Sequence, residues 1–227
     1  MKHRYFVMAW LLGRSAAAWG EGAAVSTPTI EGLDYRGSGC REGTVVSNMS
    51  PDGQAFTLIF SDYTVDSSVH SGRARRRSCD LVLKVAVPQN KSFAVFSFQV
   101  RGFAALEPGA IGVIHTRTSL SGGGREVGRL RLEGPFNDDF TVQSAQSLHQ
   151  VEWSPCGRER TRKLRLSTAT VVRPKMDFGD DDGERDDARR GGGYPAGTIS
   201  FDSIDGGVVQ RYGLVWRACS AGHEGRG

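Results

Sequence analysis

The stretch Ser92–Phe103, SFAVFSFQVRGF, decides the fold class. Apolar residues alternate along it with other residues, as expected of a β-strand that buries one face. The alternation changes phase by one residue between Val95 and Phe96. Such a slip predicts a β-bulge, which bends a strand without ending it. We therefore expect one long, bent strand here.

Similar short runs of β-branched and aromatic residues lie on both sides of this stretch. They are Gln54–Tyr63, Asp80–Val87, Ala110–Thr118, Glu126–Leu132, His149–Trp153, Lys163–Val172, Gly197–Ile204 and Val208–Arg217. SPDG at Ser50–Gly53 is typical of a β-turn, whereas SGGGR at Ser121–Arg125 and IDGG at Ile204–Gly207 are typical of hairpin connections. Many short strands separated by turn signals predict an all-β protein, an antiparallel β-sandwich of jelly-roll-like type.

The chain begins with the features of a secretory signal. Basic residues open the sequence, an apolar run covers Tyr5–Leu12, and small residues at Ala16–Ala18 precede the expected cleavage after Ala18. The apolar run is shorter than the roughly 20 residues that cross a bilayer, so we expect no membrane span and a secreted, extracellular protein. Removing the signal lowers the formal net charge from +4 to +1, which gives no reason to expect nucleic acid as a partner.

Four cysteines, an even number in an exported chain, predict two disulfides. Three pairings are possible in principle, and we favour the sequential one, Cys40–Cys79 and Cys156–Cys219, because it closes the shorter loops. Each crosslink would stabilise the fold by about 4 kcal/mol in the chain-entropy model. No two cysteines have the C-x₂₋₄-C spacing of a zinc site, so no metal is expected.

The remaining boundaries follow from composition. We expect a signal peptide at 1–18, a flexible segment at 19–28, one β-sandwich domain at 29–219 and a flexible tail at 220–227. Within the domain, the segment 177–193 (DFGDDDGERDDARRGGG) has almost no apolar side chains and is predicted to be a disordered acidic loop. It does not match the EF-hand calcium template, because aligning Gly183 with position six places Phe178 at position one and Arg189 at position twelve.

Carboxylates and histidines are the side chains that could serve as catalytic groups. A glycoside hydrolase needs two carboxylates, and the weak candidates are Asp138, Asp139, Asp202 and Asp205. Aspartates that form turns are the simpler interpretation of all four. His70, His115 and His149 lie near no zincin or nucleophile-elbow motif and are expected to be structural or surface residues.

A basic cluster precedes Cys79 and consists of Arg73, Arg75, Arg76 and Arg77. It could bind an anion, could be a processing site for a secretory-pathway protease, or could be a plain exposed loop.

Asn90 in NKS and Asn48 in NMS are acceptable glycosylation sequons, the second weakened by the proline that follows it. Trp153 and Trp216 each precede a cysteine by three residues. They are expected to pack beside a disulfide, although an exposed tryptophan could stack on a sugar ring.

Several phrases also resemble a known family. They are LDYRGSGC (Leu33–Cys40), SPDGQAFTLIFSDY (Ser50–Tyr63), RGFAAL (Arg101–Leu106), GPFNDDF (Gly134–Phe140), WSPCG (Trp153–Gly157), SIDG (Ser203–Gly206) and YGLVWRAC (Tyr212–Cys219). In this order they resemble the secreted microbial proteins of domain-of-unknown-function family 4360, from about Thr29 to Cys219. The resemblance implies export, a mostly β domain and cysteines at these four places, and it supplies no activity.

The sequence favours a non-enzymatic extracellular domain that binds a surface, with a cell-wall polysaccharide or a host surface component as partner and no cofactor. A rigid, crosslinked scaffold with long loops is suited to recognition, and no motif supplies a nucleophile. Two alternatives stay open: a secreted carbohydrate-active hydrolase that uses an Asp pair, and a structural envelope protein.

Overall fold

The bent strand predicted around Phe96 is the longest strand of the structure, β6 (Lys91–Leu106). The computed structural model describes residues 27–70, 73–175, 194–201 and 210–220. Along β6, Gly213 of β12 (Gln210–Ala218) lies opposite Ser97 and Leu214 lies opposite Val95, which leaves Phe96 without a partner. The predicted bulge is therefore confirmed at Phe96, and the strand continues through it.

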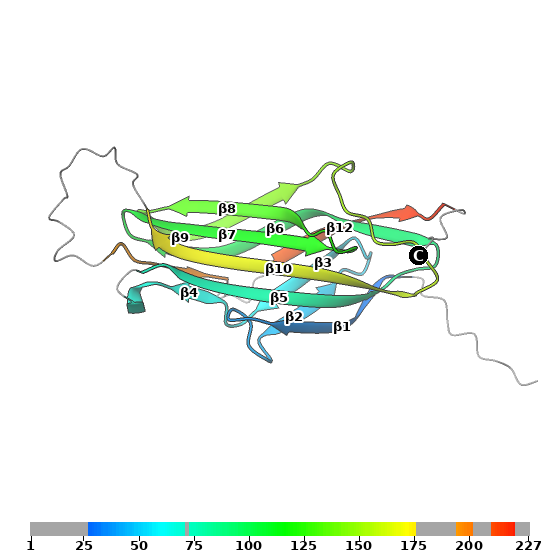
Figure 1. The fold of residues 1–227 in the computed structure, drawn as a ribbon, viewed down its shortest axis with the longest axis horizontal. Helices are drawn as coiled ribbons and strands as arrows, with labels where there is room; N and C mark the ends of the chain where they lie inside the picture. The colour runs from blue at the N-terminus through cyan, green and yellow to red at the C-terminus, as the bar shows by residue number, and fades with distance from the viewer. Residues whose placement is uncertain (1–26, 71–72, 176–193, 202–209, 221–227) are drawn as a thin grey trace, which may run out of the picture.

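Two antiparallel sheets lie one behind the other (Figure 1). The five-stranded sheet has the order β1 (Thr29–Arg36), β5 (Arg75–Ala86), β10 (Thr161–Pro174), β7 (Ala110–Ser119), β8 (Arg125–Glu133). The seven-stranded sheet has the order β2 (Val45–Met49), β3 (Ala55–Phe60), β12, β6, β11 (Gly197–Ser200), β4 (Thr64–Asp66), and β9 (Phe136–Ala145) pairs with β6. A short 3-10 helix, η1, covers Ser68–His70. The predicted antiparallel β-sandwich is confirmed.

The core lies between the sheets and is built by alternation along each strand. In β5 the inward residues Leu81, Leu83 and Val85 are fully buried, whereas the residues between them face outward. From the other sheet, Tyr212 stacks on Phe56 with ring centroids 4.7 Å apart. Each such side chain contributes about 1.5–3 kcal/mol when fully buried, so the inward faces account for most of the stability.

A chain of buried polar groups ties the sheets together. The hydroxyl of Tyr212 donates to Gln210 Oε1 (2.7 Å), and Gln210 Nε2 donates to Thr168 Oγ1 of β10 (3.4 Å). Thr168 in turn shares a 3.0 Å hydrogen bond with Thr116 of β7. Because each group finds a partner, burial costs little, and the chain fixes the position of β12 over the opposite sheet.

Both predicted disulfides are present, Cys40–Cys79 and Cys156–Cys219. The first is buried and joins the loop after β1 to β5. The second joins the loop before β10 to the residue that follows β12. The first bridge therefore ties a loop to a strand, whereas the second connects the ends of strands that belong to different sheets.

Some predictions fall outside the described residues. They are the signal peptide at 1–18, the acidic segment 177–193, the IDGG turn, and all of the flexible segments except Thr27, Pro28 and Ser220. Pro28 is buried and packs against Gly53, where a Cβ on the glycine would collide with the proline ring. No helix in the described part of the chain is long and apolar enough to cross a membrane.

The strand predictions were wrong at two kinds of place. His149–Trp153 is not a strand, because only Trp153 makes an isolated bridge, with Ala94. Four strands were missed: β1, β2, β4 and β9. They are short, or they expose so many polar side chains that a single sequence gives them no clear strand pattern.

Candidate functional site

A row of polar side chains crosses the outer face of the seven-stranded sheet. Strand register pairs each member with the next, on five neighbouring strands, and we call the set the polar row: Asn48 (β2), Thr57 (β3), Arg211 (β12), Gln99 (β6) and Gln143 (β9). Residues before and after them along these strands, such as Leu58 and Val100, are buried in the core. Since neighbouring strands lie about 4.8 Å apart, the row extends over about 19 Å.

Two shallow hollows run along the polar row. One, of about 540 Å³, is lined by Gln99, Gln143 and Arg211 together with Gly213 and the half-buried ring of Phe96. The other, of about 280 Å³, is lined by Asn48, Met49, Thr57, Gln99, Arg101 and Arg211. Because Gln99 and Arg211 line both, the hollows form one groove across the sheet.

Gly213 lines the groove and leaves space there because it has no side chain. A Cβ at this position would lie 2.2 Å from Ser97 Oγ and 2.9 Å from the ring of Phe96, so no side chain fits there without displacement. The bulge places Phe96 beside the groove. Its ring and the small residues around Gly213 provide the apolar part of the surface.

The charges in the groove are few and mixed. Asp52, in the predicted SPDG turn, accepts hydrogen bonds from Ser50 Oγ (2.5 Å) and from the Gln54 N–H (3.0 Å). The Ser50 hydroxyl, and then the Gln54 N–H, lower the pKa of Asp52, with a smaller effect of Arg211 in the same direction. A carboxylate thus lies within the field of the one arginine of the polar row. Amide and hydroxyl groups, which both donate and accept, make up the rest of that row.

The structure places two of the four candidate aspartates. Asp138 and Asp139 are consecutive exposed residues of β9, so their carboxyl groups point to opposite faces of the strand. Asp138 Oδ1 accepts the backbone N–H of Asp139 at 2.7 Å. The interpretation as turn residues was wrong for this pair. Asp202 and Asp205 lie outside the described residues, so the proposed pairing across the two sets stays a prediction.

The arginine cluster lies mostly on a strand. Arg73 precedes β5, and Arg75, Arg76 and Arg77 are its first three residues, so the expectation of a loop was wrong for three of the four. Anion binding and proteolytic processing at this cluster stay predictions.

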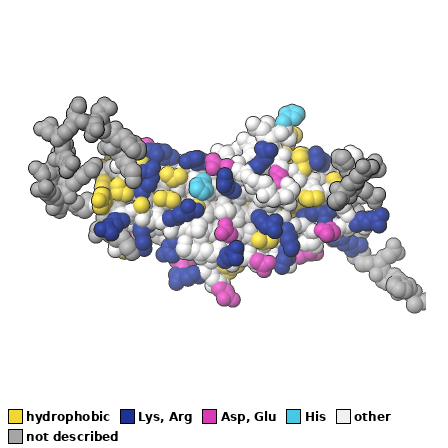
Figure 2. Space-filling model, viewed as in Figure 1, with side chains coloured by type: hydrophobic (Ala, Val, Ile, Leu, Met, Phe, Trp, Pro, Cys, Tyr) yellow, Lys and Arg dark blue, Asp and Glu magenta, His cyan; other side chains and the backbone are white. Residues whose placement is uncertain are grey.

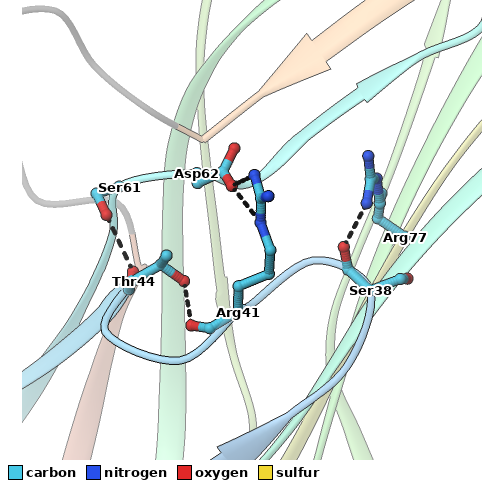
Figure 3. A network of polar contacts seen from close by, with 6 residues as sticks. All are labelled: Ser38, Arg41, Thr44, Ser61, Asp62 and Arg77. Carbon is cyan, nitrogen blue, oxygen red and sulfur yellow. Dashed lines mark hydrogen bonds and ion pairs between the residues drawn. The ribbon is translucent and has the colours of Figure 1, made fainter.

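Of the arginine cluster, Arg77 makes a hydrogen bond to a neighbouring loop. Its guanidinium donates to the Ser38 carbonyl at 2.6 Å (Figure 3). In the same loop, Arg41 pairs with Asp62, and Thr44 Oγ1 donates to the Arg41 carbonyl at 2.7 Å. The Arg77 contact holds the loop that contains Cys40 against β5, and the Arg41–Asp62 pair ties the same loop to the connection between β3 and β4.

The two sequons are both exposed. Asn90 lies in the turn between β5 and β6 with a φ of 55°, and its carbonyl accepts the N–H of Cys219 at 2.8 Å. Asn48 lies on β2 and belongs to the polar row. Glycosylation at either stays a prediction.

Both predicted disulfide-neighbouring tryptophans are half-buried. Trp216 packs against Phe93 with centroids 5.3 Å apart and donates Nε1–H to the Gly53 carbonyl at 2.9 Å. The guanidinium of Arg217 lies 4.2 Å from the ring centroid of Trp153. Other residues of the protein therefore cover part of each indole ring.

In the described part of the chain, no three His, Cys, Asp or Glu side chains are placed to share a metal ion. The sequence alone did not indicate Thr57, Gln99, Gln143 or Arg211. No local pattern distinguishes them from other outward strand residues, because their alignment arises only when distant strands pair.

Comparison with known proteins identifies the family. The model of the family "Domain of unknown function (DUF4360)" matches residues 26–219. The chain belongs to the DUF4360 family. It is 33% identical over 194 residues to an uncharacterized secreted protein of Arthroderma benhamiae (strain ATCC MYA-4681 / CBS 112371), which covers 84% of this chain and 71% of that protein. This DUF4360 protein is secreted, in agreement with its two disulfides.

Two solved structures show a distant likeness to this DUF4360 domain. TmCBM61 in complex with beta-1,4-galactotriose aligns over 84% of this chain and 90% of that chain, with a TM-score of 0.27 and 8% identity. The enzymatically active domain of bacteriophage CBA120 tailspike protein 4 aligns over 81% of this chain and 19% of that chain, with a TM-score of 0.23 and 12% identity.

Proposed function

We propose that this secreted domain is a non-enzymatic module that binds a neutral, linear polysaccharide along the polar row. The observation that supports the proposal is the alignment of five hydrogen-bonding side chains, one on each of five neighbouring strands. Strand spacing of about 4.8 Å is comparable with the length of one sugar unit in an extended chain. A chain lying across the strands would therefore meet one polar side chain for each unit.

The chemistry of the row suits sugar hydroxyls. Each hydroxyl both donates and accepts a hydrogen bond, and the amides of Asn48, Gln99 and Gln143 offer both functions. Arg211 adds a planar set of donors. The apolar face of a sugar ring would lie over Gly213 and against the ring of Phe96, which completes a surface of apolar and polar groups.

The experiment is a pull-down of the mature protein with insoluble chitin, glucan and cellulose. We expect sedimentation with at least one polymer and no release of soluble reducing sugar. The variant Q99A/Q143A should bind about 10- to 100-fold more weakly, because two hydrogen bonds of about 1 kcal/mol each are lost.

The matched control is K163A/R165A, which alters two exposed residues on the other sheet and should bind neutral polymer like the wild type. Wild-type protein that remains in the supernatant with all three polymers would contradict the proposal. So would unchanged binding by Q99A/Q143A, whereas release of reducing sugar would point to the hydrolase alternative.

A further inference from the structure

His115 lies among arginines on the outer face of the five-stranded sheet. On β8, Arg129 is its direct cross-strand neighbour, and Arg117 is two residues further along β7 on the same face. From β5, Arg76 lies close enough to act electrostatically on the imidazole. We call these four residues, contributed by three strands, the His115 cluster. Figure 2 shows Lys and Arg side chains spread over this face of the molecule.

The arginines of the cluster have no anionic partner at contact distance. Within the described residues, neither Arg76, Arg117 nor Arg129 forms a side-chain hydrogen bond or an ion pair. Glu126 lies opposite Arg117 in the register without forming an ion pair with it. Three arginines and Glu126 thus surround the imidazole, and Asp80 of β5 lies across Ser167 from Arg117. Positive charge is still in excess around His115, and this excess is available to a ligand.

The strand between the basic groups is small and uncharged. On β10, Ala169 lies opposite His115 and is 1% exposed, and the outward residues Ser167 and Val171 flank it. Arg76 therefore lies on one side of β10, whose outward side chains are small here, and His115 and Arg129 lie on the other side. Arg117 also lines a hollow of about 600 Å³ that continues toward β1. Its lining is of mixed charge: Arg36, Arg117 and Arg165 with Asp34 and Asp80.

We propose that the His115 cluster binds an acidic polysaccharide, a chain with carboxylate or sulfate groups at repeated positions, and that His115 makes this binding pH-dependent. The guanidinium of arginine can donate two hydrogen bonds at once to the two oxygens of a carboxylate or to two oxygens of a sulfate group. The site lies on the opposite sheet from the polar row and does not depend on it.

Two features favour a polysaccharide over an anionic membrane. The protein is secreted, and the large apolar side chains that the described residues expose lie elsewhere: Val46, Ile59, Val69, Phe103, Leu148 and Tyr194. None of them is on β5, β7, β8 or β10, so this face presents charge without side chains that would insert into lipid.

The direction of the pH dependence follows from the surroundings of His115. Burial lowers the pKa of its imidazole, Arg76 lowers it further, Arg129 and Arg117 act in the same direction, and Glu126 acts against them. β10 contributes no charged residue opposite the ring. The imidazole therefore protonates less readily than a free imidazole, and a bound polyanion favours its protonation. Binding should strengthen by about threefold to tenfold as the pH falls from 7 to 5.

The experiment measures affinity for heparin, a sulfated chain, and for polygalacturonate, a carboxylated chain. Neutral dextran is the comparison, and any binding to it through the polar row should not change with pH or in R76Q/R129Q. We expect binding to at least one acidic chain that weakens with salt. R76Q/R129Q should bind the acidic chain more weakly, by up to about tenfold. H115Q should bind like the wild type at pH 7 but should not gain affinity at pH 5.

The matched control is R101Q/R211Q, which removes the same charge from the other sheet and should retain affinity for the acidic chain. It should instead weaken binding to neutral polymer, so failure of one proposal is distinguishable from failure of the other. Three results would each overturn the inference. R76Q/R129Q could bind the acidic chain as tightly as the control does, the affinity of the wild type could be independent of pH, or the protein could bind only to phosphatidylserine vesicles.

Discussion

Arg162 is the residue whose replacement tests the account of stability most directly. Its side chain is only 7% exposed, and its guanidinium donates to the carbonyls of Pro155 (2.9 Å), Gly157 (3.1 Å) and Glu159. It thus organises the loop that holds Cys156 before β10 begins. R162M keeps the length of the apolar stem but removes every donor.

The magnitude follows from these contacts. Three hydrogen bonds to a charged donor would each be worth about 1.5–3 kcal/mol if the acceptors stayed buried. Pro155, Gly157 and Glu159 are exposed residues, so their carbonyls can turn to water once the donor is gone. We therefore expect a total loss of about 3 kcal/mol, or a melting temperature lower by about 6–12 °C for a domain of this size.

The assay is thermal and urea unfolding followed by tryptophan fluorescence. The matched control is K163M, at the next position, where an exposed side chain faces outward from the sheet. K163M should change the free energy of unfolding by less than about 0.5 kcal/mol. If R162M proved as stable as K163M, the carbonyl contacts would not be what holds this loop.

Three further changes test other parts of the fold. C40S/C79S should lower the free energy of unfolding by about 4 kcal/mol, since the bridge spans 39 residues; the urea midpoint under non-reducing conditions checks this. G128A should cost about 1–3 kcal/mol by thermal unfolding, because the added Cβ would lie 2.1 Å from the ring of Phe98; an unchanged midpoint would contradict the packing. Burial raises the pKa of Tyr63 to about 12, so wild-type stability should fall as the pH rises above 10. Y63F should lose about 1 kcal/mol at pH 7, match the wild type between pH 10 and 12, and be the more stable of the two at pH 12 in alkaline unfolding, because the wild type loses about 2 kcal/mol over that range.

Sequence reasoning succeeded where local pattern and fold agree. Alternation identified β6 and its bulge at Phe96, because an inward and an outward face leave a direct trace in the residue order. The disulfide pairing followed from loop length. β9 was missed because FNDDFTVQSA buries only part of one face, so its polar residues look like a turn.

The candidate sites could not be predicted in the same way. Asn48 and Gln143 become members of one row only through the pairing of five strands, and their sequence positions say nothing about register. His115 was expected to be a structural or surface residue, and the arginines around it come from three strands. A single sequence reports which face a residue takes, whereas a site depends on which residues share that face.

Strand β6 pairs with a neighbouring strand on each of its two edges, and this determines how rigid the ligand-binding surface is. Residues 97–100 of this strand hydrogen-bond to β12 on one edge and to β9 on the other. Gln99 therefore projects from backbone that local fraying does not reach, and the backbone amide protons of residues 97–100 should exchange with solvent only when the whole domain unfolds. A polymer that docks here meets a surface already in its bound shape and loses little of its binding free energy to ordering the protein.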